Sequence, residues 1–325
     1  MERLFAAGTA TIQQSNNNSD PFAGLLPWEL TDEPGLRVPV ADDGALQLEF
    51  GAALFEFTGL CHFADALPPH LLQACLAAAE AHTSTTRKSV EALGIAPDGP
   101  RGFRFHEACQ RGPGRVDMRL GASPPVPFDD ARLVGAEAKW APLVREILGA
   151  DCRLLHVGLV VTEPGVSTEQ ALHCDGPHVA AEWRRHEPEV AARARQEQHP
   201  CHCLTVFLPL VDLTVANGAT TFFPGTHHSA IAASALSREA EDPGSSGGAG
   251  RPARLLLPAG DAILFDYRLF HAGGANRSHA RRPLLCLVYA RPWFEDTFNF
   301  GTIRLSDVQV SSGDEVDTGI CKQSK

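Results

Sequence analysis

The residues His173 and Asp175 lie in the middle of the chain, within the segment Ala171–Gly176. Residues two apart in extended backbone point to the same side, so an imidazole and a carboxylate are presented to a common point. Both groups are metal ligands, but two ligands leave a metal ion underfilled and the pattern His-x-Asp often arises by chance. The pair therefore predicts a metal site only if the chain supplies a third ligand elsewhere.

His271 is the candidate for that third ligand. It follows the apolar segment 262–265, which is typical of a buried strand, and it precedes Gly273 and Gly274, where another group can approach closely. Two histidines and one carboxylate on a β-scaffold are the ligand set of non-haem Fe(II) oxygenases. Such a set leaves coordination positions open for a co-substrate and oxygen.

A candidate anion-binding residue, Arg282, stands at the start of the last apolar strand. An arginine there can bind the distal carboxylate of a dicarboxylate through two hydrogen bonds, while the 2-oxo acid end chelates the metal. Arg281 is its neighbour, but side chains alternate along a strand, so only one of the two should point inward. The Pro283 and strand that follow favour Arg282.

Three further side chains are candidates for binding the co-substrate: the amide of Gln170 and the hydroxyl of Thr221 or of Thr220. Ordinary hydrogen bonds within a strand or turn explain each of them equally well.

Several arginines would suit a carboxylated substrate. The stretch 101–120 is rich in arginine and glycine and includes Arg115, while Arg184 and Arg185 follow the His-x-Asp segment. Arginines that are solvated or paired with surface carboxylates are the alternative for all of them.

Composition limits the classes of partner. The chain has 325 residues and a formal net charge of -11, which argues against binding to nucleic acid or to an anionic membrane. No apolar stretch is long enough to span a bilayer, and the N-terminal residues lack the pattern of a secretory signal. The nine cysteines show no repeating spacing, which favours reduced thiols and a cytoplasmic location. The sequence does not indicate an oligomeric state.

The pattern of elements indicates a single domain. Residues 1–30 are polar and are expected to form a flexible arm, residues 31–300 the domain, and residues 301–325 a tail. Short strands are expected at 46–50 and 54–57, and then helices from Pro68 and over 129–149 that pack outside a sheet. After residue 150 the chain changes to short strands separated by turns, which suggests a sandwich or barrel. These strands are expected at 153–162, 202–213, 219–224, 253–257, 261–268 and 282–291, with a helical insert at 188–195 and a surface loop at 242–250.

Four segments together resemble the phytanoyl-CoA dioxygenase-like family of Fe(II)/2-oxoglutarate oxygenases. They are His173-Cys174-Asp175-Gly176, Asn217 to His227, Asp266 to His271, and Asn276 to Pro283, and the closing segment Tyr289 to Phe294 also fits. The resemblance implies a mixed α/β protein with an all-β core, a double-stranded β-helix (jelly roll) of about residues 150–295 flanked by N-terminal helices. It also implies that His173, Asp175 and His271 bind iron and that Arg282 binds 2-oxoglutarate.

The implied reaction uses Fe(II), 2-oxoglutarate and O2, with ascorbate as a supporting reductant in vitro. It oxidises a C–H bond of a small organic substrate and releases succinate and CO2. Hydroxylation, desaturation and oxidative cyclisation all use the same iron ligands. The halogenating relatives replace the carboxylate ligand with a small residue, so the presence of Asp175 disfavours halogenation.

Three other functions remain open at this point. One is a specialised-metabolite oxidative cyclase of the algal kainoid type, acting on a carboxylated substrate derived from an amino acid. Another is a metal enzyme that does not use 2-oxoglutarate, in which Arg282 would be an ordinary surface charge. The third is a non-catalytic jelly-roll protein that binds a metal or small ligand, and its usual mark, loss of a ligand or of the arginine, is absent from this sequence.

Overall fold

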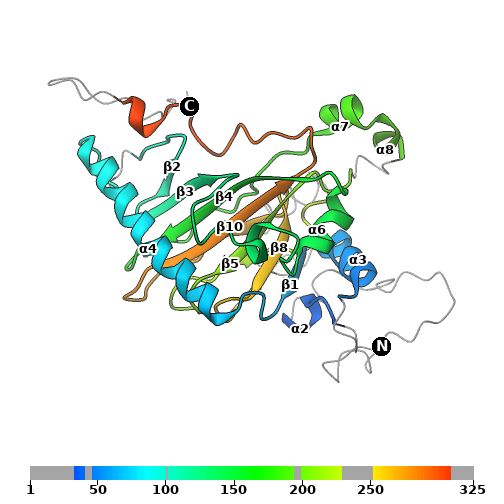
Figure 1. Ribbon diagram of the computed structural model, residues 1–325, viewed down its shortest axis with the longest axis horizontal. Helices are drawn as coiled ribbons and strands as arrows, with labels where there is room; N and C mark the ends of the chain where they lie inside the picture. The colour runs from blue at the N-terminus through cyan, green and yellow to red at the C-terminus, as the bar shows by residue number, and fades with distance from the viewer. Residues whose placement is uncertain (1–32, 41–45, 100–101, 194–198, 229–251, 309–325) are drawn as a thin grey trace, which may run out of the picture.

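The computed structural model describes residues 33–40, 46–99, 102–193, 199–228 and 252–308. Within these ranges, two antiparallel sheets face each other in a jelly roll, as expected (Figure 1). The strands are β1 (Leu60–Phe63), β2 (Ala108–Gly112), β3 (Arg115–Gly121), β4 (Arg153–Thr162), β5 (Cys203–Pro209), β6 (Thr221–Phe222), β7 (Ala253–Arg254), β8 (Ala262–Asp266), β9 (His271–Ala272) and β10 (Arg282–Ala290). The larger sheet has the order β1-β8-β5-β10-β4-β3-β2, and the smaller sheet has the order β7-β6-β9.

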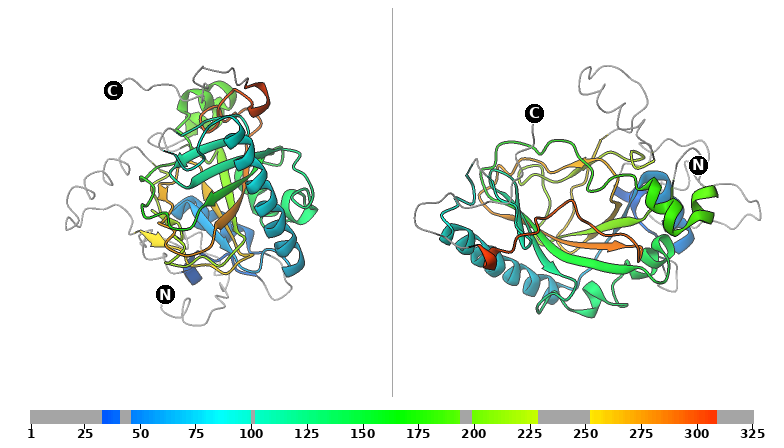
Figure 2. Two further views of the ribbon diagram at one scale, coloured as in Figure 1. Left: turned by 90° about the vertical axis from the view of Figure 1, so that its left-hand side faces the viewer. Right: turned by 90° about the horizontal axis from the view of Figure 1, so that it is seen from above.

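The helices lie around this core. They are α2 (Glu33–Leu36), α3 (Leu48–Thr58), α4 (Pro69–Ala92), α5 (Ala131–Val134), α6 (Ala141–Leu148), α7 (Ala180–His186) and α8 (Pro188–Arg193), with the 3-10 helix η3 at Leu305–Asp307. The long helix α4 crosses the outer face of the larger sheet, which Figure 2 shows from two further directions. Its buried residues recur every three or four positions, so one stripe of the helix faces the sheet.

The larger sheet has one apolar face and one functional face, because alternate residues of a strand point to opposite sides. The outward residues of the central strands are buried with α4 in one core cluster: Val116, Met118, Val157, Leu159, Val161, Leu285 and Leu287. The inward residues of the same strands include Arg115, Asp117, His156 and Arg282. The strand register places Thr162 between two of them, since it pairs with Arg115 on one side and with Arg282 on the other.

Three of the expected elements are wrong, namely two strands and one helix. The segment 46–57 does not form strands: most of it is the helix α3, whose buried residues are Gly51, Leu54, Phe55 and Thr58. These positions follow helical spacing. The alternation of apolar and polar residues over 46–50, which suggested a strand, overlaps the first turn of α3. The single helix expected over 129–149 is interrupted after Val134 and resumes at Ala141, so that α5 and α6 are separate.

The hairpin β2–β3 was not expected as strands at all. It comes from the stretch 101–120, where charged residues alternate with apolar ones. A bulge between Gln110 and Gly112 of β2 shifts the register of its pairing with β3. The other expected strands form, although those at 219–224 and 253–257 shorten to two residues each.

Several sequence-based expectations lie outside the described residues, namely the arm at 1–30, the loop at 242–250 and most of the tail. In the part of the chain that is described, no helix is long and apolar enough to cross a membrane. The eight cysteines of that part are all free thiols, and burial raises the pKa of Cys201 and Cys203 well above the usual range.

A buried ion pair fixes the turn between β8 and β9, which delivers His271 to the site. The guanidinium of Arg268 binds Asp266 through two hydrogen bonds of 2.8 and 2.7 Å and also donates to the carbonyl of His199. Both side chains are almost fully buried. Burial alone would raise the pKa of Asp266, but Arg268 outweighs it and holds this pKa below its usual range.

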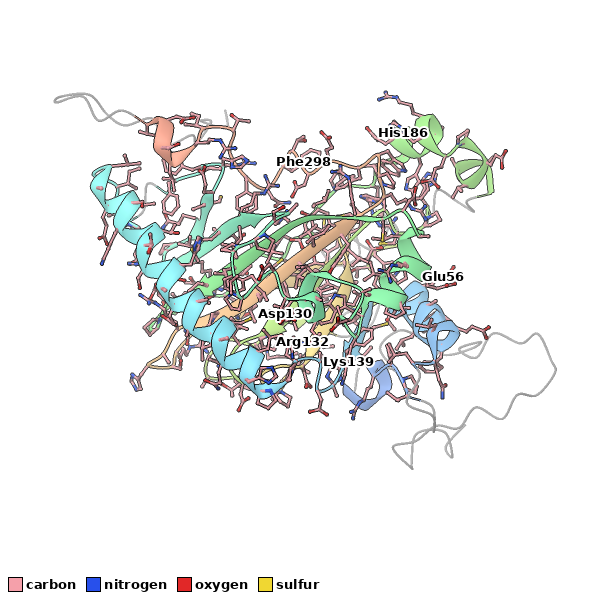
Figure 3. The ribbon with its side chains drawn as sticks, viewed as in Figure 1. Glu56, Asp130, Arg132, Lys139, His186 and Phe298 are labelled. Atoms are coloured by element: carbon pink, nitrogen blue, oxygen red, sulfur yellow. The ribbon has the colours of Figure 1, made fainter. Side chains whose placement is uncertain are left out.

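We predict that Arg268→Ala lowers the free energy of unfolding by about 3–5 kcal/mol, because it leaves a buried carboxylate without a cation. Urea denaturation measures this loss. Arg132→Ala is the matched control, since Arg132 binds Asp130 with the same geometry and spacing, but at the surface (Figure 3). The control should shift the urea midpoint little, because solvent screens an exposed ion pair. Equal losses in the two variants would contradict the prediction.

Candidate metal centre

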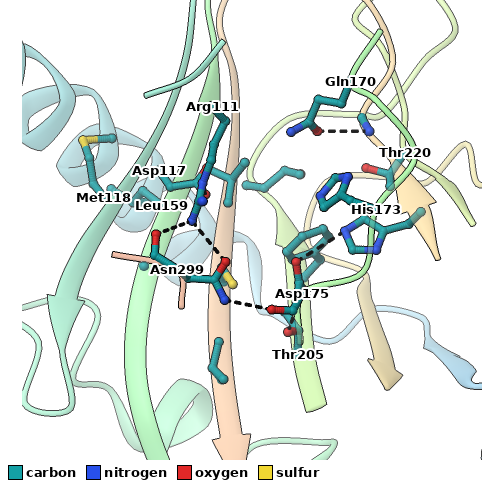
Figure 4. A pocket seen from close by; sticks show the side chains of 18 of the residues that line it. Arg111, Asp117, Met118, Leu159, Gln170, His173, Asp175, Thr205, Thr220 and Asn299 are labelled. Carbon is teal, nitrogen blue, oxygen red and sulfur yellow. Dashed lines mark hydrogen bonds and ion pairs between the residues drawn. The ribbon is translucent and has the colours of Figure 1, made fainter. Parts of the chain in front are cut away.

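His173, Asp175 and His271 come together at one end of the space between the sheets. One ligand atom from each residue lies within 4.8 Å of the others, and the Nε2 atom of His271 is 3.7 Å from Oδ1 of Asp175. The backbones of the two histidines pair through hydrogen bonds of 3.0 and 2.8 Å, which attach the segment around His173 to strand β9. Residues almost one hundred positions apart are thus held side by side (Figure 4).

The two imidazoles are oriented so that the same nitrogen faces the centre. Nδ1 of His173 lies 2.8 Å from the carbonyl of Ala171, and Nδ1 of His271 lies 3.0 Å from the carbonyl of Leu269. A carbonyl can only accept, so each Nδ1 carries the proton and each Nε2 keeps its lone pair. Burial lowers the pKa of His271, which also favours its neutral form. Two such nitrogens and a carboxylate fit a divalent transition metal.

Asp175 is placed by the turn that follows it. The backbone N–H of Gly176 donates to the carbonyl of Tyr267 at 3.0 Å, which brings the two segments into contact. A Cβ atom on Gly176 would lie only 2.5 Å from the Tyr267 ring, so the glycine of the His-Cys-Asp-Gly segment makes this approach possible.

Arg282 is 1% exposed and lines the same cavity as the three ligands. Its guanidinium donates to the hydroxyl of Thr162 at 2.9 Å and to the carbonyl of Gly218. Burial, followed by the nearby charge of Arg115, lowers its pKa to about 10, so it remains a cation at neutral pH. Among the described residues no carboxylate lies within ion-pair distance of it. The neighbouring Arg281 instead points outward and pairs with Glu163 and Glu80.

Arg115 lies behind Arg282 and is not part of the cavity wall. It is 4% exposed and donates to the carbonyls of Thr168 and Gly274, each at 2.7 Å. Its second amino group is 3.5 Å from the hydroxyl of Thr162, which therefore accepts from two guanidinium groups. Arg115 contributes positive charge near Arg282 and fixes two loops.

The structure distinguishes between the two candidate threonines. Thr220 is buried and lines the cavity, whereas the hydroxyl of Thr221 accepts a hydrogen bond from Arg254 and does not line it. Gln170 lines the cavity as expected, with its amide oxygen held by the backbone N–H of Gly273 at 3.1 Å.

Arg184 and Arg185 are exposed on α7, and neither lines the cavity. Figure 3 labels His186 at the end of this helix, on the rim of the molecule. The side chain of α7 that points inward is Trp183, which is fully buried.

The cavity around the ligand set has a volume of about 70 Å³. Its wall combines the inward residues of the larger sheet with residues that follow the last strand. The polar and aromatic wall residues that sequence reasoning did not select as site residues include Arg111, Asp117, His156, Asn299 and Phe300. The alternation of charged and apolar residues over 115–119 was a usable signal for Asp117, but no local pattern marks Asn299 or Phe300.

Phe300 is clamped in this wall. Its ring lies under the guanidinium groups of Arg119 and Arg111, at 4.8 and 5.7 Å from the ring centroid, and it meets the His156 ring edge-on. Burial, followed by the charge of Arg119, lowers the pKa of His156 to about 4, so this imidazole is neutral at pH 7. Phe300 thus gives this wall an aromatic face.

We predict that His173→Ala or Asp175→Ala raises the dissociation constant for Mn(II), a redox-stable probe, because each variant loses a metal ligand. The rise should exceed the roughly 10–100-fold that follows loss of a residue that only hydrogen-bonds to a ligand. Anaerobic titration followed by electron paramagnetic resonance measures the affinity. Cys174→Ala is the control, because Cys174 lies between the two ligands and its thiol donates to the carbonyl of Gly176 instead. If the control lost as much affinity as the ligand variants, the assignment would be wrong.

Comparisons with known proteins identify the family of this chain. A model of the phytanoyl-CoA dioxygenase (PhyH) family matches residues 55–284. The chain is similar to the non-heme alpha-ketoglutarate-dependent epimerase SnoN from nogalamycin biosynthesis, with 22% identity and a TM-score of 0.47 over 84% of this chain and 93% of that chain. It is also similar to EctD from S. alaskensis with bound Fe, with 20% identity and a TM-score of 0.47 over 74% and 75%. Because the family match spans most of the sequence, the chain belongs to the PhyH family of non-haem iron, 2-oxoglutarate-dependent enzymes.

Proposed function

We propose that this protein uses O2 to oxidise a C–H bond of a small organic substrate and, in the same reaction, converts 2-oxoglutarate into succinate and CO2. The observation that carries the proposal is the buried cation Arg282, which shares a cavity with His173, Asp175 and His271 and has no carboxylate within ion-pair distance among the described residues. A buried charge without a counter-ion is costly, so the site is built to receive an anion.

Each residue has a separate role in this proposal. His173, Asp175 and His271 would hold the iron, at a place where they line the cavity. Arg282, whose guanidinium is held by the hydroxyl of Thr162, binds the distal carboxylate of 2-oxoglutarate. When bound, iron would activate O2 at the expense of 2-oxoglutarate, and O2 is the oxidant for the C–H bond.

The remaining wall of the cavity excludes water and orients the substrate. Inward side chains of the larger sheet, among them Val160, Leu284, Val288 and Phe207, give it apolar surface beside the ligands. A carboxylated substrate gains no support from Arg184 or Arg185, which are exposed outside the cavity.

We predict that Arg282→Leu raises the dissociation constant for 2-oxoglutarate about 10–100-fold, since hydrogen bonds to charged groups contribute about 1.5–3 kcal/mol. Calorimetric titration of the Mn(II)-loaded protein under argon measures it. Arg281→Leu is the control at the neighbouring position, and it should leave the constant nearly unchanged because Arg281 pairs with surface carboxylates. An equal effect in both variants would assign the anion site elsewhere.

The activity itself is tested by succinate formation from 2-oxoglutarate with Fe(II) and ascorbate under air. We expect slow formation without a substrate, and faster formation when a panel of candidate metabolites includes one that fits the cavity. His271→Ala should abolish both rates. A protein that binds Mn(II) and 2-oxoglutarate but never forms succinate would support a non-catalytic binding protein.

A further inference from the structure

The segment that follows the last strand is tied directly to the metal centre through Asn299. We propose that Asn299 and Arg111 form a latch that positions Asp175 for the metal, so that both are positioning residues of the proposed oxygenase. The inference rests on the proposed function, because it assumes that Asp175 is a ligand. Asn299 lies beyond the region that the family model matches, so the family resemblance does not assign it this role.

Asn299 reaches Asp175 through its side-chain amide. Its Nδ2 atom donates to the backbone carbonyl of Asp175 at 2.9 Å, and it also lies 2.9 Å from the hydroxyl of Tyr267 and 3.1 Å from Oδ2 of Asp296. Tyr267 in turn donates to Asp296 at 2.7 Å. The amide is therefore held on several sides, and it restrains the peptide group of the ligand residue.

Arg111, on strand β2, holds Asn299 from the side away from Asp175 (Figure 4). Its Nη2 atom donates to the backbone carbonyl of Asn299 at 2.7 Å and lies 3.3 Å from the side-chain oxygen, while its Nε atom donates to Asp117 at 2.6 Å. The hydrogen bonds run from the hairpin β2–β3 through Asn299 to Asp175 (Figure 4). Because Asp117 balances the charge of Arg111, the arginine serves as a fixed fork of donors and needs no anionic ligand.

Asp175 has few other restraints of its own. Among the described residues, the hydroxyl of Thr205 is the one hydrogen-bond donor to its carboxylate, and it lies at the limit of 3.5 Å from Oδ2. Asp175 follows a half-buried segment outside any strand, and its carboxylate is partly exposed. The position of this ligand thus depends on its backbone, which Asn299 and the Gly176–Tyr267 hydrogen bond hold. Outer contacts of this kind commonly change metal affinity about 10–100-fold.

The test compares the metal affinity of Asn299→Ala with that of the wild-type full-length chain, using Mn(II) alone as the probe. We expect the dissociation constant for Mn(II) to rise about 10–100-fold. Arg111→Lys, which keeps the positive charge but loses the fork, should show a smaller rise of about 3–10-fold, within the range for loss of one outer hydrogen bond. This second variant keeps the inference testable if Asn299→Ala does not fold.

Arg304→Ala is the matched control, because Arg304 ties the same segment to Glu107 at 3.2 Å without contacting the metal centre. If the latch acts on Asp175, this control binds Mn(II) as the wild type does. If all three variants lose affinity equally, the segment has only a general structural role and the inference is overturned. Wild-type affinity in Asn299→Ala and Arg111→Lys would also overturn it.

These results separate the inference from the proposed function. A wild-type chain that binds no Mn(II) would overturn both. A wild-type chain that binds Mn(II), but whose affinity is lost in His173→Ala and kept in Asn299→Ala, would leave the proposed function standing and remove the latch.

Discussion

The metal centre depends on the backbone pairing of His173 with His271. Both residues belong to extended segments, and two hydrogen bonds join these segments into a short antiparallel bridge at the edge of the smaller sheet. The bridge brings the ring centroids of the two imidazoles to 4.5 Å from each other. The backbone hydrogen bonds hold them there, so the side chains need not attract each other. Backbone hydrogen bonds are indifferent to side-chain type, so the fold can place two ligands while the side chains remain free to bind the metal.

The larger sheet has the complementary task of separating the core from the chemistry. Its outward residues pack against α4 in a continuous apolar cluster, and its inward residues include charged groups that no apolar core would tolerate. The strict alternation of a β-strand makes this division possible within a single layer. The pairing of Thr162 with Arg115 on one side and Arg282 on the other is a direct result of strand register.

Much of the centre was predictable from sequence because its residues lie in short local patterns. His173 and Asp175 are two residues apart. Alternation indicated that only one of Arg281 and Arg282 points inward, and Pro283 with the apolar strand that follows favoured Arg282. The wall of the cavity was harder to predict. Arg111 and Asn299 meet only through the folded hairpin and the segment after β10, and neither is marked by its neighbours in sequence. The choice between Thr220 and Thr221 depended on which face of β6 turns inward, and α3 was misjudged because a few alternating residues fit both periods.

Thr162 receives hydrogen bonds from two guanidinium groups, and this arrangement has a thermodynamic consequence for the whole protein. Two buried positive charges repel each other, and among the described residues neither has a carboxylate at ion-pair distance. Any dianion that binds between the sheets relieves this repulsion in the folded state alone, so its binding free energy adds to the stability of the fold. The folded domain is therefore harder to unfold when a dianion fills this space than when none is bound.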